Sequence, residues 1–148
     1  MTHPPVLLGI DFGGTKIAIA VCDLAGNKLA SVVVDSLGER GARVSFDHGI
    51  QTAKALLAES ADGARLTAVG VATFGIPFED RVELAPAIPG WEGLELGREL
   101  RAAFPGAAIR TVVLADASPG TLADIRPPFA PIGNKASTWL CQTLLFPA

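Results

Sequence analysis

The feature that most constrains the fold of this chain is a buried apolar run that stops at a carboxylate and two glycines. Val6 to Ile10 is a short, continuous apolar segment, which is typical of a strand buried on both faces. Asp11 and the turn residues Gly13 and Gly14 follow, and a second strand-like segment begins at Lys16. The sequence therefore predicts a β-hairpin whose turn carries polar and cationic groups.

The segments after the hairpin predict an α/β domain. A third strand over 28–34 completes an antiparallel meander. Apolar residues at helical spacing predict a helix over 44–61, with Ser45 as its N-cap and Gly63 serving its C-terminal end. The strand that follows this helix is expected to run parallel to the first strand. The later expected elements are strands at 66–73, 81–84 and 108–115 and a helix at 94–104, giving the main order β-β-β-α-β-α-β.

The composition provides a core and excludes several classes of protein. Of the 148 residues, 49% are apolar and 18% are charged, which fits one folded domain and not a disordered chain. The net charge is −3 and no basic stripe occurs, which argues against a protein that binds nucleic acid through its phosphates. No apolar run is long enough for a signal peptide or a membrane span. We expect a cytoplasmic protein that binds neither nucleic acid nor a membrane.

The cysteines and histidines are too few for a structural metal or disulfide framework. Cys22 and Cys141 with His3 and His48 make up the whole set. We expect no zinc site and two reduced thiols.

The turn of the predicted hairpin has the residue types of a phosphate site. Gly13 and Gly14 can adopt positive φ and let the backbone approach a ligand, and successive turn amides can form an anion-binding nest. Thr15 adds a hydroxyl donor and Lys16 adds a positive charge. Asp11 suits a water bound to Mg²⁺, because two anions need a cation between them. The alternative interpretation is a plain Gly-Gly hairpin turn.

Further motifs downstream accompany this turn. The segment 69–77 (Val-Gly-Val-Ala-Thr-Phe-Gly-Ile-Pro) follows about sixty residues later, and 84–93 (Leu-Ala-Pro-Ala-Ile-Pro-Gly-Trp-Glu-Gly) precedes an amphipathic helix. With the Asp-x-Gly-Gly-Thr-Lys turn, this order resembles the N-terminal domain of the ROK family of repressors and sugar kinases, over roughly Val6 to Arg110. The likeness is strongest to the glucokinase side of that family.

The resemblance implies a fold and a chemistry. The fold would be the ribonuclease-H-like (actin-like ATPase) domain, a mixed five-stranded sheet flanked by helices. The reaction would be phosphoryl transfer from MgATP to the 6-hydroxyl of a glucose-like hexose, with Asp11, Gly13, Gly14, Thr15 and Lys16 near the transferred phosphate. The loops at Gly75 and at Pro89 and Gly90 would line the sugar cleft. For Trp91 we favour a buried anchor over a residue that stacks on the sugar.

The chain departs from the family pattern at the expected catalytic base. The family has an Asn-Asp pair after the fifth strand, whose Asp takes the proton of the sugar hydroxyl. Here Asp116 is the candidate base, but Ala115 replaces the Asn and Asp116 comes about two residues late. An N-cap role for Asp116 is the alternative. A second departure is Ala87, where many members have Asn.

The end of the sequence also departs from the family. We expect residues 1–117 to form the ROK-type N-terminal lobe and residues 118–148 to be an atypical, proline-rich tail that is frame-altered or disordered. The family's second lobe, with its adenine site and its zinc motif, is not present in this sequence. We therefore expect weak or no activity from this chain by itself.

Other functions of such a lobe stay open. It could be a non-catalytic lobe that binds a sugar, a phosphate or a partner. The repressors of the family carry a helix-turn-helix before this lobe, whereas here the first strand already begins at Val6. A DNA-binding regulator is therefore not expected. The expected partners are a hexose and ATP, and an exposed interlobe face could support a homodimer or self-association.

Overall fold

A five-stranded mixed sheet organises the molecule. The computed structural model describes residues 3–73, 76–78, 81–83 and 88–113, with side chains described for 3–73 and 88–109. The strand order in the sheet is β3-β2-β1-β4-β7. The strands are β1 (Pro5–Phe12), β2 (Lys16–Asp23), β3 (Lys28–Asp35), β4 (Arg65–Thr73) and β7 (Ala108–Val113).

The directions of the strands follow the sequence pattern. β1, β2 and β3 form an antiparallel meander, because tight turns join them. β4 runs parallel to β1, and β7 runs parallel to β4, because a helix or a longer connection precedes each. The predicted meander and the predicted parallel strand are both confirmed.

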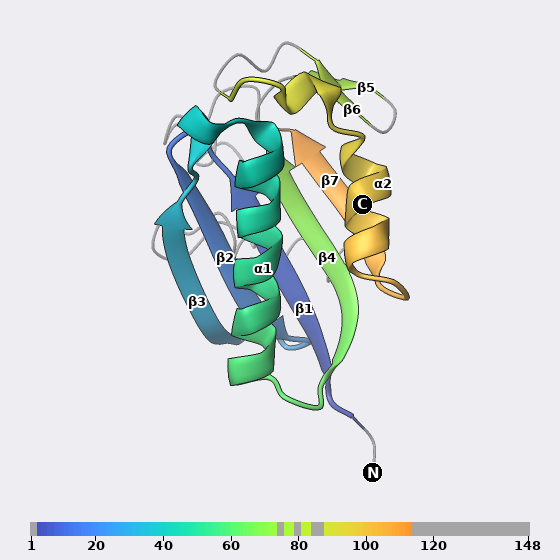
Figure 1. Ribbon diagram of the computed structural model, residues 1–148. Coiled ribbons are helices and arrows are strands. Elements are labelled where there is room, and N and C mark those ends of the chain that lie inside the picture. The colour runs from blue at the N-terminus through green and yellow to red at the C-terminus, as the bar shows by residue number, and fades with distance from the viewer. Residues whose placement is uncertain (1–2, 74–75, 79–80, 84–87, 114–148) are drawn as a thin grey trace.

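Two helices lie on one face of the sheet (Figure 1). They are α1 (Ala42–Ser60) and α2 (Leu96–Ala103). A short 3₁₀ turn precedes each: η1 (Gly38–Arg40) and η2 (Trp91–Gly93). The segment between β4 and η2 contains a small antiparallel ribbon of β5 (Ile76–Phe78) and β6 (Arg81–Glu83). The predicted strand at 81–84 therefore has a partner that the sequence did not reveal, and the predicted helix at 94–104 is shorter.

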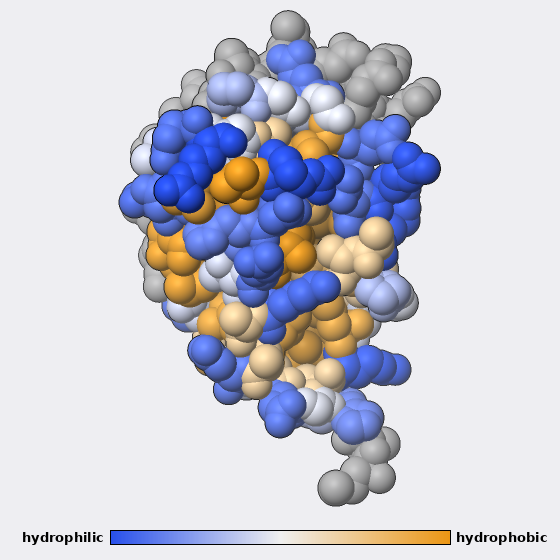
Figure 2. Space-filling view, in the orientation of Figure 1, coloured by the Kyte–Doolittle hydropathy of each residue, from blue (hydrophilic) through white to orange (hydrophobic). Residues whose placement is uncertain are grey.

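The main core lies between the helices and the sheet. Alternate side chains of β1 and β2 face α1, as the period of a strand requires. Phe12 is central, with its ring 5.7 Å from the ring of Phe46 and 5.2 Å from that of Trp91. Figure 2 shows that apolar surface extends between the two helices, where partly buried side chains pack against this core. A smaller buried cluster of Leu7, Ala20, Cys22 and Ala68 lies on the other face of the sheet.

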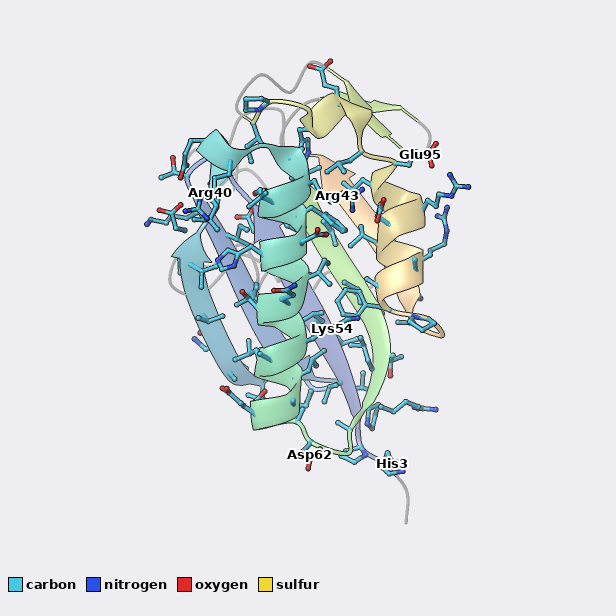
Figure 3. All side chains as sticks on the ribbon, in the orientation of Figure 1. His3, Arg40, Arg43, Lys54, Asp62 and Glu95 are labelled. Atoms are coloured by element: carbon cyan, nitrogen blue, oxygen red, sulfur yellow. The ribbon has the colours of Figure 1, made fainter. Side chains whose placement is uncertain are left out.

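Polar contacts join the two helices at their surface. Arg43 of α1 forms an ion pair with Glu99 of α2, with a closest N–O distance of 2.7 Å. The ammonium of Lys54 lies 5.7 Å from the centre of the Phe104 ring, and both cations project from α1 (Figure 3). These contacts link the exposed surfaces of α1 and α2, while the buried side chains of Trp91, Leu96 and Leu100 pack η2 and α2 into the core.

The start of α1 differs from the prediction. The helix begins at Ala42, with Gly41 as its N-cap, so the predicted cap at Ser45 is wrong. The reason is tertiary: the first helical N–H, that of Ala42, donates to the carbonyl of Pro89 at 2.9 Å. At the other end, Gly63 has φ +76° in the turn after the helix, as predicted.

Replacing Gly49 by Ala is expected to destabilise the protein. A Cβ at Gly49 would lie 2.6 Å from Cε1 of Phe12 and 3.3 Å from Cδ1 of Ile17. Both neighbours are buried, so the overlap should outweigh the gain in helix propensity, at a net cost of about 1–2 kcal/mol. Urea denaturation measures the difference. Gly93→Ala is the matched control, because a Cβ there would have no atom within 4 Å. Equal stability of both variants would contradict the prediction.

Replacing Ser45 by Ala is expected to leave the stability unchanged or to raise it by about 1 kcal/mol. Among the residues that the structure describes, the buried Ser45 hydroxyl has no hydrogen-bond partner, and alanine removes that group while favouring the helix. Thermal and urea unfolding measure the effect. Ser60→Ala is the control, because its hydroxyl donates to the Leu56 carbonyl. A clear loss of stability in Ser45→Ala would contradict the interpretation.

Candidate functional site

The carboxyl ends of the three parallel strands meet at one edge of the sheet. β1 ends at Phe12, β4 at Thr73 and β7 at Val113. In sheets of this kind, ligands bind beyond the carboxyl ends of the strands. Gly75 and Asp116, predicted for the sugar cleft and for the base, lie outside the described residues. The strands that precede them both end at this edge.

The predicted hairpin turn lies at this edge, between β1 and β2. The Gly13 N–H donates to the Lys16 carbonyl at 2.9 Å and closes the turn. A Cβ at Gly13 would lie only 2.7 Å from that carbonyl oxygen, which explains the glycine. The positive φ expected at Gly13 and Gly14 is wrong, because neither glycine has its φ in the left-handed region. The constraint at Gly13 is close approach of the backbone to itself.

The turn directs its carbonyls to one side and its N–H donors to the other. Ser36 binds the two carbonyls of the turn: its N–H donates to Thr15 O at 2.8 Å, and its hydroxyl donates to Gly14 O at 2.8 Å. In a trans peptide the N–H points opposite to the C=O, so the N–H groups of Thr15 and Lys16 point away from Ser36. Within the described part of the chain, neither N–H has an acceptor, and the Thr15 hydroxyl has no partner. This arrangement can bind an anion.

Asp11 lies beside the turn, on the face of the sheet opposite α1. Its neighbours Ile10 and Phe12 point into the helix-covered core, so the alternation of β1 directs Asp11 to the other face. Ala18 and Ala72 are its partners on the adjacent strands, and neither of these small side chains offers a charge or a hydrogen bond to the carboxyl group. Burial raises the pKa of Asp11 from its ordinary 3.8 to about 6. The carboxylate is thus poorly hydrated and should gain from a nearby cation.

Lys16 is on the same face of the sheet as Asp11, by the alternation of β2. Its ammonium lies 3.7 Å from a carboxylate oxygen of Asp35 on β3. The two side chains are 61% and 56% exposed, so this pair contributes little and leaves the lysine able to move to a ligand. Its predicted contact with phosphate stays a prediction.

The Pro-Gly-Trp segment packs at the N-terminal end of α1. Pro89 and Gly90 are exposed, and Gly90 has φ +83°, which favours glycine. Trp91 is only 1% exposed, and its indole N–H donates to the Thr73 hydroxyl at 2.9 Å. The buried-anchor interpretation of Trp91 is therefore confirmed. The anchor attaches this loop to the carboxyl ends of β1 and β4.

One connecting segment that the sequence analysis missed lies between the two loops. The segment 35–42 contacts the hairpin through Ser36 and contacts the Pro-Gly-Trp loop through Ala42. A Cβ at Gly38 would lie 3.0 Å from Gly14 O and 3.2 Å from Ile88 Cγ1. The available signal was a serine and two glycines directly after a strand, which indicates a shaped turn and not a plain linker.

Two further findings concern metals and membranes. Among the described residues, no group of three or more His, Cys, Asp or Glu side chains is placed to hold a metal ion. A search of the same residues found no helix with the length and apolar character that crossing a membrane requires. The prediction that the chain has no zinc site also depends on Cys141, which lies outside the described residues.

Comparisons with known proteins agree with this architecture. The sequence model of the ROK family matches residues 7–123. The structure resembles a ROK hexokinase from Thermus thermophilus, with 31% identity, a TM-score of 0.61, and coverage of 76% of this chain and 36% of that one. It also resembles a ROK family glucokinase from Streptomyces griseus, solved in complex with glucose and AMPPNP, with 27% identity, a TM-score of 0.56 and coverage of 76% and 34%.

A third similar structure is an inorganic polyphosphate/ATP-glucomannokinase from Arthrobacter sp. strain KM, with 27% identity, a TM-score of 0.53 and coverage of 78% of this chain and 46% of that one. No curated protein matches the chain. The chain thus spans less than half the length of each of these structures. The expected fold, a mixed five-stranded sheet of the actin-like ATPase type, is confirmed.

Replacing Asp11 by Asn is expected to stabilise the protein at neutral pH. The pKa of Asp11 is higher in the folded chain, so the stability that its neutral form contributes is complete below about pH 4 and is lost as the pH rises through about 6. Asparagine carries no charge, so Asp11→Asn should raise the free energy of unfolding by at most about 3 kcal/mol near pH 7.5 and by almost nothing near pH 4. Urea denaturation at the two pH values measures it.

Asp62→Asn, at an exposed position in the turn after α1, is the control for this experiment. It should not reproduce the dependence on pH. An Asp11→Asn variant that is equally or less stable than the wild type near pH 7.5 would contradict the prediction.

Proposed function

Because the chain belongs to the ROK family, we propose that it forms the N-terminal lobe of a sugar kinase that transfers the γ-phosphoryl group of ATP to the 6-hydroxyl of a glucose-like hexose. The observation that carries this proposal is the hairpin at the carboxyl end of β1. Its Thr15 and Lys16 N–H groups have no acceptor in the described residues and point to one side, beside the half-buried Asp11.

The hairpin would bind the transferred phosphate. Backbone N–H groups, the Thr15 hydroxyl and the Lys16 ammonium offer donors and positive charge, which is what a phosphoryl group needs in its transition state. The poorly hydrated carboxylate of Asp11 suits a hydrated Mg²⁺ that accompanies the nucleotide, and Asp11 would contact this ion through water. Such a cation would reduce the charge of the phosphates.

The sugar would lie between the hairpin and the loop at Pro89 and Gly90. The hexose 6-oxygen would form a bond to the γ-phosphorus as the bond to the β,γ-bridging oxygen breaks and ADP leaves. The hydroxyl proton would pass to the carboxylate of Asp116, which follows β7 by three residues. The loop at Gly75 would line the same cleft. These roles agree with the convergence of the β1, β4 and β7 ends at one edge.

We propose that residues 1–117 form this lobe and that residues 118–148, of which the family model matches only 118–123, form an atypical tail. One lobe encloses only half of an interlobe cleft, so the chain by itself should turn over slowly or not at all. The open cleft face could support self-association. The competing proposal, a lobe that binds sugar or phosphate without catalysis, is favoured by Ala87 and Ala115 in place of amide side chains.

A chimaera tests the activity. Residues 1–117 replace the corresponding lobe of the Thermus thermophilus ROK hexokinase, which supplies the second lobe. We expect MgATP-dependent phosphorylation of glucose, and Asp116→Asn should lower kcat by about 10²–10⁴-fold, because a general base contributes about that much. A coupled assay for ADP measures the rate.

Asp62→Asn in the same chimaera is the control and should keep the full rate. A folded chimaera that binds glucose and MgATP without turnover would support the non-catalytic lobe. Equal turnover of the Asp116→Asn variant would exclude Asp116 as the base.

A further inference from the structure

Ser36, a serine that follows β3, makes two hydrogen bonds to the candidate phosphate turn. The side chain is buried, with 1% of the residue exposed. Its N–H donates to Thr15 O and its hydroxyl donates to Gly14 O, each at 2.8 Å. One residue therefore holds two successive carbonyls of the turn, although 22 positions separate Ser36 from Gly14 in the chain.

We propose that Ser36 is a positioning residue for phosphate binding, which holds the peptide planes of the turn so that the Thr15 and Lys16 N–H groups face the ligand. This role rests on the function proposed above. Because each peptide is planar and trans, binding its carbonyl on one side directs its N–H to the other side. Donors that are held before the ligand arrives need no reorganisation when it binds.

The need for such a contact comes from the turn itself. Gly14 and Thr15 are exposed, and glycine gives the chain more conformational freedom than any other residue. The Gly13 N–H closes the turn with one bond to Lys16 O. That bond does not restrain the Gly14–Thr15 peptide, whose carbonyl is bound by the Ser36 hydroxyl.

Ser36 is itself rigidly held. Its Oγ accepts a hydrogen bond from the Gly38 N–H at 3.2 Å, while it donates to Gly14 O. A carboxylate oxygen of Asp35 accepts from the Leu37 N–H at 2.8 Å. Leu37 has φ +55°, a left-handed conformation that is unfavourable for a residue with a Cβ, so the surrounding contacts must maintain it. Only a side chain that both donates and accepts, such as a hydroxyl, can occupy this position in the same way.

Titration of the whole chain with magnesium tripolyphosphate, followed by amide NMR shifts, tests the proposal. In the wild type the Thr15 and Lys16 amide signals should shift. Ser36→Ala should weaken the affinity by about threefold to tenfold, which is the effect of one lost hydrogen bond. Ser36→Thr keeps the hydroxyl and should bind nearly as the wild type does. Ser31→Ala, in the preceding strand β3, is the matched control and should bind normally.

A second variant keeps the test valid if Ser36→Ala unfolds. Gly38→Ala places a Cβ 3.0 Å from Gly14 O and 3.3 Å from Ser36 Oγ. It should therefore disturb the contact between Ser36 and Gly14 and weaken binding, although the serine is retained. Thermal unfolding of each variant separates loss of the fold from loss of the phosphate contact, and rescue by Ser36→Thr is a result that burial alone does not predict.

Three results would overturn the proposal, and they differ in what else they exclude. Wild-type affinity in folded Ser36→Ala would exclude the role of Ser36 and leave the phosphate turn intact. Equal weakening by Ser36→Thr and Ser36→Ala would show that the hydroxyl is not the group that matters. Absence of any shift at Thr15 and Lys16 in the wild type would exclude the phosphate turn itself, and with it the proposed function of the lobe.

Discussion

The packing of Phe12 underlies the arrangement of the site. This residue ends β1, and its ring stacks on Phe46 of α1 and meets Trp91 of η2 at 5.2 Å. Gly49 makes the close approach of the helix possible, because any Cβ there would overlap the ring. One aromatic side chain therefore joins the helix, the Pro-Gly-Trp loop and the strand that leads into the hairpin. Asp11 precedes Phe12 and Gly13 follows it, and both belong to the candidate site. Packing of Phe12 in the core therefore fixes the backbone between these two site residues.

The alternation of β1 places core residues on one face of the sheet and a candidate site residue on the other, within three successive positions. Ile10 and Phe12 point into the apolar core, while Asp11 points to the other face, between Ala18 and Ala72. A half-buried carboxyl group in such surroundings is poorly hydrated, which raises its pKa and opposes folding at neutral pH. Asp11 weakens the folded chain at neutral pH and is next to a turn whose Thr15 and Lys16 N–H groups have no acceptor among the described residues. A ligand explains this combination better than packing does, because a functional site can carry such a cost.

Local patterns predicted most of the fold, because strands and helices have short sequence periods. The meander, the parallel strand after the helix and the buried Trp91 all followed from such patterns or from residue type. The start of α1 did not, because the Ala42 N–H is bound by Pro89, a residue 47 positions away. A local rule therefore placed the cap at Ser45, which is buried inside the helix. The partner of the strand at 81–83 was missed for a similar reason, since a strand of three residues has too few alternations to be recognised.

The sequence by itself determined the hairpin, its polar turn and the order of elements that places three strand ends together. It also indicated the family, through motifs that neighbouring residues form. Only the tertiary structure decided which way the turn faces, since Ser36, Gly38 and Ile88 come from segments far from Gly14 in the chain. Likewise, the pKa of Asp11 depends on its burial in the folded chain. The physical reason is that hydrogen-bond direction and solvation depend on neighbours in space, whereas periodicity and turn chemistry depend on neighbours in sequence.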